Sequence, residues 1–547
     1  MKNIHILDCT LRDGGRIIDC AFPDDHIRGI TKGLRDASVD VVEMGFLRSG
    51  VEYKGNSTYF SEIDQFAKFI PENRGNTMYV AFCDYGQEFH MWDFSKLPPC
   101  DGSTVTGIRL GFRKKDMYNA IPTAKRIKEL GYTLFIQGVE SLNYNDKELL
   151  ELIDIINDIK PHSFGIVDTY GAMYTDDVMH LYNLVDHNLD KEIAIDFHSH
   201  NNMMMSFAFA QMVVVASNGV RPIYLDATLE GMGKGTGNLN TELIMDYLIR
   251  KRGYTYNIDV VFDTIDTYLH GIKEKYSWHY QIPSYFAGIY SSHANNIKYL
   301  QDKHRLNTKD IKNILMMMDP VARKRYNYDS IEKLYIDYCS TKVDDTAARE
   351  ALDGKFRGNS VLVLIPGHSI AERKAEIQEF IDREKPIVIA VNFVPNMNCG
   401  KDLFIFYGNK RKYETEKRSA NIPVILSSSI VPEGDGKNVF VVNYRDLIHT
   451  EPGIKYFDNS AVMLLNLLNQ LFVKRIFIAG FDGFDTNAKS NFCRDELSDE
   501  RFEKDYDVIN KDVTMLLKQF SDTLADDVSV TFVTPSRFSY IFENGRP

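Results

Sequence analysis

Short apolar runs alternate with longer amphipathic stretches through the first half of the chain. The runs have the continuous apolar character of strands buried on both faces. The segments between them carry apolar residues at helical spacing, as in Ile27–Ala37, Lys147–Ile159 and Met203–Ser217. Strand and helix alternate eight times, which predicts an α/β fold of the TIM (β/α)8 barrel type. The core of this barrel is expected over about residues 1–250, and the whole domain over residues 1–290. The eight runs are Ile4–Thr10, Val39–Gly45, Met78–Cys83, Gly107–Gly111, Thr133–Val139, Ser163–Asp168, Glu192–His198 and Pro222–Leu229.

The second half has a different pattern. Residues 291–352 are predicted to be a helical extension that ends in a linker near residues 352–359, where glycines and charges cluster. Strand-like runs then return and alternate with helical segments, which predicts a doubly wound, Rossmann-like α/β domain over residues 358–547. In such sheets ligands bind beyond the carboxyl ends of the strands. The residues at those ends are 366–369, Asn392 and 480–483.

Two polar clusters lie at the ends of predicted strands, where TIM barrels carry their catalytic residues. The first contains Arg12 and Asp13, and the second contains His198 and His200. The two histidines lie two residues apart on a strand and therefore point to the same side. With Asp13 they offer a two-histidine, one-carboxylate face for a divalent metal, with Mn²⁺ or Mg²⁺ favoured and Zn²⁺ or Fe²⁺ as alternatives. Alternatively, the His-x-His spacing is accidental and Asp13 only caps a turn.

Further polar residues follow other strands of the predicted barrel. Arg12 would lie beside the ion and stabilise an enolate oxygen as it forms. Glu43 and Arg109 lie in the second and fourth strands and are predicted to bind substrate. The glycine-rich segment 230–238 follows the eighth strand and would let backbone amides approach an anion, although it lacks the order of a P-loop.

Composition narrows the class of protein. The net charge is −12, and no basic stripe offsets it, which argues against a nucleic-acid-binding protein. The seven cysteines are scattered and form no CxxC pair, so a reducing cytoplasm is expected. No apolar run is long enough to cross a membrane, so no membrane partner is expected. Association into a homo-oligomer is compatible with this composition.

The first 340 residues resemble the DRE-TIM metallolyase superfamily, and within it the 4-hydroxy-2-oxovalerate aldolases. The resemblance rests on the opening motif from Asp8 to Gly14, on the sequence from His198 to Asn202, on the loop ending in Asn238, and on the segment 287–292. It implies a TIM barrel that binds a divalent metal through Asp13, His198 and His200. It also implies a pyruvate-type 2-oxo acid and an aldehyde as reactants.

The same resemblance assigns further roles. Tyr290 would sit over the acceptor aldehyde, and Thr169 would touch the substrate carboxylate. One position departs from the aldolase pattern: Arg16 stands where those enzymes have a catalytic histidine. Arginine is no base at ordinary pH, so His26, Tyr290 or water on the metal would take that role, or the reaction differs. We interpret Arg16 as a residue that binds an anionic substrate.

The C-terminal domain is faintly similar to bacterial glycan-related α/β domains that include sialyltransferase-like proteins, through segments 366–369, 390–392 and 475–482. That similarity implies a role for the aldolase in surface-sugar biosynthesis. Two other functions remain open. One is a Claisen-type synthase joining an acyl-CoA to a 2-oxo acid. The other is a non-catalytic barrel that scaffolds a sugar-nucleotide-binding domain. For the C-terminal domain alone, the alternative to sugar-nucleotide binding is a plain α/β domain used for assembly.

Overall fold

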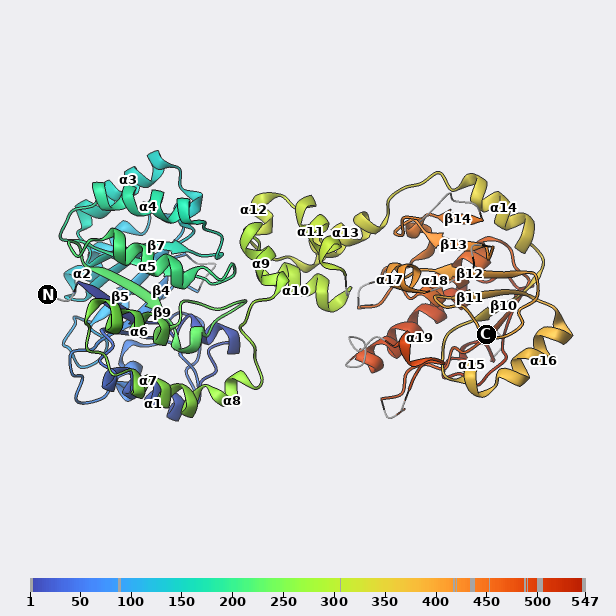
Figure 1. The fold of residues 1–547 in the computed structure, drawn as a ribbon, viewed down its shortest axis with the longest axis horizontal. Helices are drawn as coiled ribbons and strands as arrows, with labels where there is room; N and C mark the ends of the chain where they lie inside the picture. Colours follow the sequence, from blue (N-terminus) through green and yellow to red (C-terminus); the bar gives the residue numbers. More distant parts are fainter. Residues whose placement is uncertain are drawn as a thin grey trace. The chain divides into compact units, whose positions relative to one another are not determined.

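The computed structural model describes residues 3–86, 90–304, 306–416, 419, 421–432, 438–451, 453–486, 488, 490–498 and 505–543. The chain folds into two compact units, shown in Figure 1. The first unit comprises Met1–Ile297 and Pro320–Arg325, and the second comprises Lys298–Asp319 and Tyr326–Pro547. The helical segment after residue 291 is therefore divided between the two units.

The first unit is a closed parallel barrel. Neighbouring strands pair in the order β1-β9-β8-β7-β6-β5-β4-β2, and β1 also pairs with β2, which closes the ring. This confirms the predicted TIM barrel. The short strand β3 (Tyr59–Phe60) adds to the edge of β2. The barrel strands are β1 (Ile4–Asp8), β2 (Val41–Leu47), β4 (Met78–Asp84), β5 (Gly107–Phe112), β6 (Thr133–Gly138), β7 (Ser163–Asp168), β8 (Ala194–Ser199) and β9 (Ile223–Ala227).

Amphipathic helices surround the barrel (Figure 1). Helix α1, for example, buries Ile27, Ile30 and Leu34 on one face and keeps charged residues on the other, because apolar side chains three and four positions apart share a face. The helices of this unit are α1 (Asp24–Asp36), α2 (Ile121–Glu129), α3 (Asp146–Ile159), α4 (Thr175–Asn188), α5 (Ser206–Ala216), α6 (Thr241–Arg252), α7 (Ile258–Tyr268), α8 (His270–Lys273), α9 (Ile282–Ile289) and α12 (Pro320–Arg323), with α10 (Ala294–Lys303) spanning the division.

The interior of the barrel is built in layers, because alternate residues of each strand point inward. The lower layer is apolar and includes Val41, Val80, Phe135, Ala194 and Tyr224. Two residues further along β2, β6, β8 and β9 the inward side chains are polar, and Arg109 of β5 lies among them. These side chains are Glu43, Arg109, Gln137, Asp196 and Asp226, all fully buried or nearly so. We call these five residues the ionic layer, and it forms the floor of the site described below.

The second unit contains a seven-stranded, fully parallel sheet in the order β14-β13-β12-β11-β10-β15-β16, which confirms the predicted doubly wound α/β domain. The strand order reverses between β10 and β15. The strands are β10 (Ser360–Leu364), β11 (Ile387–Val391), β12 (Leu403–Tyr407), β13 (Val424–Ser427), β14 (Val439–Val442), β15 (Arg475–Ala479) and β16 (Ser529–Phe532). The helices are α11 (Thr308–Met317), α13 (Tyr328–Cys339), α14 (Thr346–Phe356), α15 (Ser369–Glu372), α16 (Lys374–Glu384), α17 (Lys410–Thr415), α18 (Ser460–Gln470), α19 (Tyr506–Thr523) and α20 (Tyr540–Glu543).

Helix α14 occupies part of the segment predicted as a linker. Leu352 and Phe356 are fully buried, one helical turn apart, and so anchor the last turn of α14. The glycines at positions 354 and 358 suggested a flexible connection, but the apolar pair fixes the helix instead. Within the described residues, no helix has the length and apolar character needed to span a bilayer.

Candidate metal centre

Three side chains converge at the carboxyl ends of β1 and β8. The Nε2 atoms of His198 and His200 lie 3.9 and 3.7 Å from Asp13 Oδ2. Taking one ligand atom from each of the three residues, all three atoms lie within 4.8 Å of one another. Asp13 Oδ2 is buried and has no hydrogen-bond partner among the described residues. A buried, unpartnered carboxylate oxygen facing two imidazoles fits a cation, because leaving it unpaired is costly.

The protonation states also suit metal binding. Burial lowers the pKa of His200 to about 4, so its ring is neutral at physiological pH and can act as a ligand. Burial alone would raise the pKa of Asp13, but the permanent charge of Arg12 holds that pKa well below its usual range, with smaller contributions from His200, His198 and Arg16. Asp13 is therefore a carboxylate, as a metal ligand must be.

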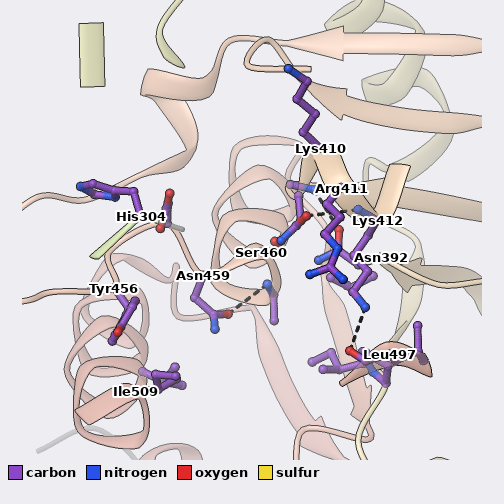
Figure 2. A pocket seen from close by; sticks show the side chains of 18 of the residues that line it. His304, Asn392, Lys410, Arg411, Lys412, Tyr456, Asn459, Ser460, Leu497 and Ile509 are labelled. Atoms are coloured by element: carbon purple, nitrogen blue, oxygen red, sulfur yellow. Dashed lines mark hydrogen bonds between the residues drawn. The ribbon is translucent and has the colours of Figure 1, made fainter. Parts of the chain in front are cut away.

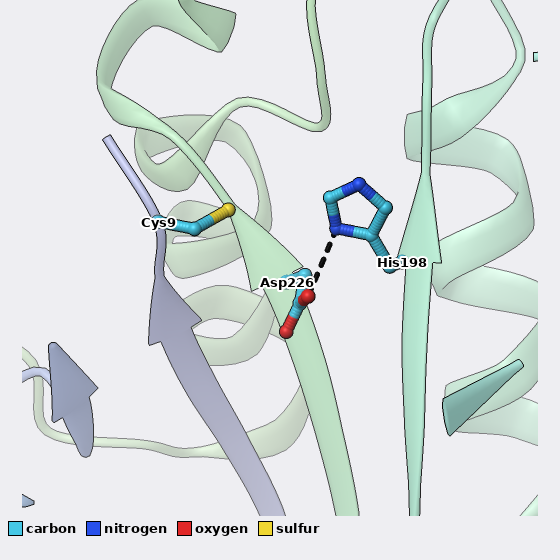
Figure 3. A group of neighbouring side chains, drawn as sticks. All are labelled: Cys9, His198 and Asp226. Atoms are coloured by element: carbon cyan, nitrogen blue, oxygen red, sulfur yellow. Dashed lines mark hydrogen bonds and ion pairs between the residues drawn. The ribbon is translucent and has the colours of Figure 1, made fainter. Parts of the chain in front are cut away.

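Asp226 orients His198 from below (Figure 3). Asp226 Oδ2 lies 2.9 Å from His198 Nδ1. A carboxylate only accepts hydrogen bonds, so Nδ1 carries a proton, and Nε2 is the ring nitrogen that faces Asp13. Cys9 also lies near this pair. Its thiol donates to the Ala227 carbonyl, and burial raises its pKa well above the usual value, so it is a neutral thiol and a poor ligand.

Arg12 lies beside the three converging residues and is almost completely buried. Its Nη1 donates to Asp13 Oδ1 at 2.7 Å, and its Nε donates to Glu43 Oε2 at 2.6 Å. The guanidinium also lies over the ring of Phe82, 4.3 Å from its centroid. These contacts hold the guanidinium in one orientation next to the candidate metal ligands, as a preorganised cation requires.

The ionic layer supports both groups. Arg109 donates from Nη1 to Glu43 at 3.0 Å and from Nη2 to Asp196 at 2.8 Å and Asp226 at 2.6 Å. Glu43 thus joins Arg109 to Arg12, and Asp226 joins Arg109 to His198. Sequence analysis predicts that Glu43 and Arg109 bind substrate. The contacts seen are with these neighbours, so substrate contact by either residue stays a prediction.

Asp226→Asn is expected to lower the affinity for Mn²⁺ by about 10- to 100-fold, because the substitution removes the acceptor that orients His198. Titration of the apoprotein with Mn²⁺ measures this change, with the unfolding temperature recorded alongside. Asp186→Asn is the matched control, since Asp186 also accepts from a buried arginine, Arg221, but on the outer helix α4. Equal affinity for Mn²⁺ in the Asp226→Asn variant and the parent would show that Asp226 does not support metal binding.

The remaining predicted residues lie on loops at the same end of the barrel. Tyr290 follows helix α9, whose Gly288 packs directly against the Gly171 carbonyl in the loop after β7. That loop also carries Thr169, whose hydroxyl accepts from the Glu140 amide at 2.8 Å. The positions of Tyr290 and Thr169 are compatible with substrate contact, and their individual roles remain predictions.

The glycine-rich loop packs against the segment that carries His200. His200 and Asn238 form a β-bridge, and the Asn201 amide donates to the Gly237 carbonyl at 2.8 Å. Gly237 has a φ of +81°, and a Cβ there would lie 1.9 Å from the Gly231 carbonyl oxygen, so only glycine fits. The amides of Thr236, Gly237 and Asn238 donate within the protein. The loop therefore shapes the site, and these three amides do not form an anion cradle.

Arg16 lies at the rim of the centre, and its side chain is 38% exposed. Its Nε is 3.3 Å from Asp13 Oδ1, its Nη2 is 3.8 Å from Asp84 Oδ2, and its guanidinium lies over Phe46. Positive charge surrounds this position. Burial, together with the charges of Lys234, Arg16 and Arg113, lowers the pKa of His293 to about 4.

Sequence analysis did not single out four residues of this region: Asp226, Asp84, Lys234 and His293. Asp226 is an acid within an otherwise apolar strand, and that interruption was its only signal. Lys234 is a cation inside the glycine-rich loop. Neither signal identifies a partner, because the contacts depend on which strands become neighbours when the barrel closes.

Comparison with known proteins supports the predicted resemblance. Residues 113–267, within the barrel, match the family model described as HMGL-like. A 4-hydroxy-2-oxovalerate aldolase from Moorella thermoacetica is 25% identical over 57% of this chain and 90% of its own length. An oxaloacetate decarboxylase from Mycobacterium tuberculosis is 23% identical over 47% of this chain and 74% of its own length. The crystal structure of an HMG-CoA lyase from Brucella melitensis aligns with 12% identity and a TM-score of 0.41, covering 50% of this chain and all of that one.

Proposed function

We propose that this chain, whose barrel matches the HMGL-like family and resembles the DRE-TIM metallolyases, is a divalent-metal-dependent carbon–carbon lyase. We propose further that it acts as an aldolase on a pyruvate-type 2-oxo acid. The observation that carries the proposal is the buried Oδ2 of Asp13, which has no hydrogen-bond partner among the described residues and faces two imidazoles beside a fixed guanidinium. The aldolase among the similar proteins supports the reaction class.

Asp13, His198 and His200 would hold the ion, with Mn²⁺ or Mg²⁺ favoured by one hard oxygen and two nitrogen ligands. The ion would supply Lewis-acid polarisation of the keto oxygen of the substrate. Arg12 then stabilises negative charge on that oxygen, because its guanidinium is permanently charged and already oriented by Glu43 and Asp13. Cleavage of the bond between C3 and C4 of a 4-hydroxy-2-oxo acid yields the pyruvate enolate and an aldehyde.

A base must remove the proton of the 4-hydroxyl group as that bond breaks. Arg16 occupies the position of the aldolase histidine. His26 contacts Asp25 and the ring of Tyr268, on helices α1 and α7 outside the barrel. Tyr290 lies on the loop side of the centre, and we propose it, with solvent, for this role.

The cations around Arg16 favour an acceptor that carries its own negative charge. Arg16 reaches two carboxylates, Asp13 and Asp84, and Asp13 is also shared with Arg12 and the two histidines. Burial raises the pKa of Asp84, and the charges of Arg16, Arg12, Arg48 and Arg113 act in the opposite direction. We propose that a carboxylate or phosphate on the aldehyde fragment completes the charge balance at this rim.

The test begins with the chain purified without chelator and analysed for bound metal. Pyruvate release is then measured against a panel of 4-hydroxy-2-oxo acids with neutral, carboxylated and phosphorylated tails. We expect one divalent ion per chain and pyruvate release that requires it. Absence of both would overturn the proposal. Release of CoA from acetyl-CoA and a 2-oxo acid, without any cleavage activity, would identify the Claisen-type alternative instead.

Arg16→His is expected to raise KM for carboxylated or phosphorylated substrates by about tenfold with little gain in kcat, because one charge-assisted contact is lost. Steady-state kinetics on the charged and neutral substrates separate the two parameters. Lys32→His, on the outer helix α1, controls for the change of side chain. A higher kcat with unchanged KM would show instead that the site lacked only a base.

A further inference from the structure

Two lysines that line the cavity of the second unit already have partners within the protein. This cavity, of about 330 Å³, lies at the carboxyl ends of the strands (Figure 2), and its wall includes the strand-end residues Gly367, Asn392 and Gly480. Lys410 pairs with Asp310 at 3.2 Å, and Lys412 donates to the Leu497 carbonyl at 2.8 Å. The rim of the barrel differs in this respect, because two of its cations have no such partner.

Three arginines at the mouth of the barrel each stack on an aromatic ring. The pairs are Arg12 over Phe82, Arg16 over Phe46 and Arg48 over Tyr59, with distances from guanidinium carbon to ring centroid of 4.3, 4.9 and 4.6 Å. The ring of Phe46 lies 5.6 Å from that of Phe82 and 5.4 Å from that of Tyr59. The three guanidiniums are therefore held on one aromatic platform, and a stacked guanidinium keeps the N–H donors at its edge available.

The partners of the three guanidiniums differ. Arg12 contacts Asp13 and Glu43 at short distances, and Arg16 approaches Asp13 at 3.3 Å. Arg48 makes no side-chain hydrogen bond and no ion pair among the described residues, and its Nε is buried without an acceptor. A buried donor that lacks an acceptor is costly, and a bound anion would satisfy it.

Lys234 is the second cation without a partner. It lies in the loop after β9, while Arg16 follows β1 and Arg48 follows β2 directly. Strand β1 pairs with both β9 and β2, so the three loops are neighbours at the carboxyl end of the barrel. Desolvation by the surrounding loops and the charge of Arg16 both lower the pKa of Lys234, as expected of two cations held near each other. In the described part of the chain, Lys234 makes no ion pair and no side-chain hydrogen bond.

The carboxylates near these cations are shared or have other partners. Asp13 is a proposed metal ligand. Asp84 lies 3.8 Å from Arg16. Burial raises the pKa of Asp84, and the charges of four arginines, including Arg16 and Arg48, act in the opposite direction, so this one carboxylate is shared among several cations. Asp19 is exposed and accepts from a tyrosine hydroxyl at 3.4 Å. Among the described residues, none of these carboxylates is in contact with the two unpaired cations.

We propose that Arg16, Arg48 and Lys234 bind a phosphate group carried by the aldehyde part of the substrate. This inference rests on the proposed aldolase reaction, and it identifies the substrate class as 4-hydroxy-2-oxo acids with a phosphorylated tail. A phosphate monoester carries a charge of about −1.5 to −2 at pH 7 and offers three acceptor oxygens. Donors from three neighbouring loops can contact it together, whereas a carboxylate offers only two oxygens and one charge.

The phosphate group is not transferred in this reaction. Cleavage breaks the bond between C3 and C4, a base takes the proton of the 4-hydroxyl group, and the resulting enolate takes up a proton at C3 to give pyruvate. The phosphate leaves on the aldehyde. Its contacts with the rim therefore act by placing the carbon chain against the metal centre.

Calorimetric titration of the full chain in the presence of Mg²⁺ tests the site without relying on activity. The probes are glycerol 3-phosphate, glycerol and the carboxylate 4-hydroxybutanoate. We expect glycerol 3-phosphate to bind at one equivalent per chain, at least about tenfold more tightly than the other two. Equal binding of glycerol 3-phosphate and 4-hydroxybutanoate, or no binding of glycerol 3-phosphate, would overturn the proposal.

Two variants locate the site. Arg48→Gln and Lys234→Gln should each weaken the binding of glycerol 3-phosphate by about tenfold, because each removes a charge-assisted contact. The matched controls are Arg28→Gln, since Arg28 is stacked on a ring outside the barrel, and Lys251→Gln, in the last turn of α6. Both controls should bind within about twofold of the parent, because distant surface charges are screened. Unfolding temperatures verify the fold of each variant. Unchanged binding in Arg48→Gln would refute the assignment.

Pyruvate release separates this inference from the proposed reaction. For 4,5-dihydroxy-2-oxohexanoate 6-phosphate, kcat/KM should be at least about tenfold higher than for the same acid without its phosphate, and Arg48→Gln should remove most of this difference. Equal cleavage of both acids would leave the proposed lyase in place and show that the phosphate site is wrong. Binding of glycerol 3-phosphate that depends on Arg48, without cleavage of either acid, would support the site and contradict the reaction.

Discussion

A His200→Ala chain is expected to lose its divalent ion and its lyase activity together. Among the described residues, three side chains converge on the proposed ion, so removing one imidazole should weaken metal affinity by at least about 100-fold, more than the loss of an orienting partner does. Metal analysis after dialysis, followed by pyruvate release with and without added Mn²⁺, measures both effects.

His180→Ala is the matched control, because His180 lies on the outer helix α4 and pairs only with the exposed Asp146 among the described residues. This variant should keep both metal and activity. If His200→Ala retained a full equivalent of tightly bound ion, the proposed ligand set would be wrong.

Arg12→Lys is expected to keep the metal and to lower kcat by about 100- to 1000-fold, the usual effect of removing one preorganised donor to a developing oxyanion. A lysine keeps the positive charge but cannot contact Asp13 and Glu43 in the fixed geometry of the guanidinium. Metal analysis and single-turnover rates separate binding from chemistry.

Arg28→Lys controls for the loss of a guanidinium stacked on a phenylalanine, since Arg28 lies over Phe69 on the outside of the barrel. That variant should react at the parental rate. A parental rate in Arg12→Lys would exclude Arg12 from the chemical step.

Much of the fold could be predicted from the sequence, because buried parallel strands leave a strong signal. Val41–Leu47 and Ile223–Ala227 are apolar almost throughout, and such runs separated by amphipathic helices have few other solutions. The candidate ligands could be predicted from the sequence for a similar reason. The histidines at positions 198 and 200 share a strand, so their common direction follows from strand geometry alone.

The support beneath the ligands could not be predicted in the same way. Asp226 meets His198 only because β8 and β9 are neighbours in the closed barrel. Arg109 meets Glu43 across the interior, and their positions are 66 residues apart in sequence. Nothing in the neighbouring sequence distinguishes these charged residues from isolated surface charges. The last turn of α14 was missed for the opposite reason: local glycines suggested a break that tertiary packing overrides.

The ionic layer is also relevant to the question of whether the barrel is catalytically active. Moving charged groups into a protein interior costs several kcal/mol per ion, and replacing buried ion pairs by apolar side chains of similar volume is often neutral or stabilising by about 1–4 kcal/mol. A barrel kept only as a spacer would therefore tolerate, and even gain from, the loss of Arg109 and its carboxylate partners. This chain has the whole set, at the base of the proposed metal ligands. Such a cost in folding free energy is expected of an active enzyme rather than of a domain that has lost its activity.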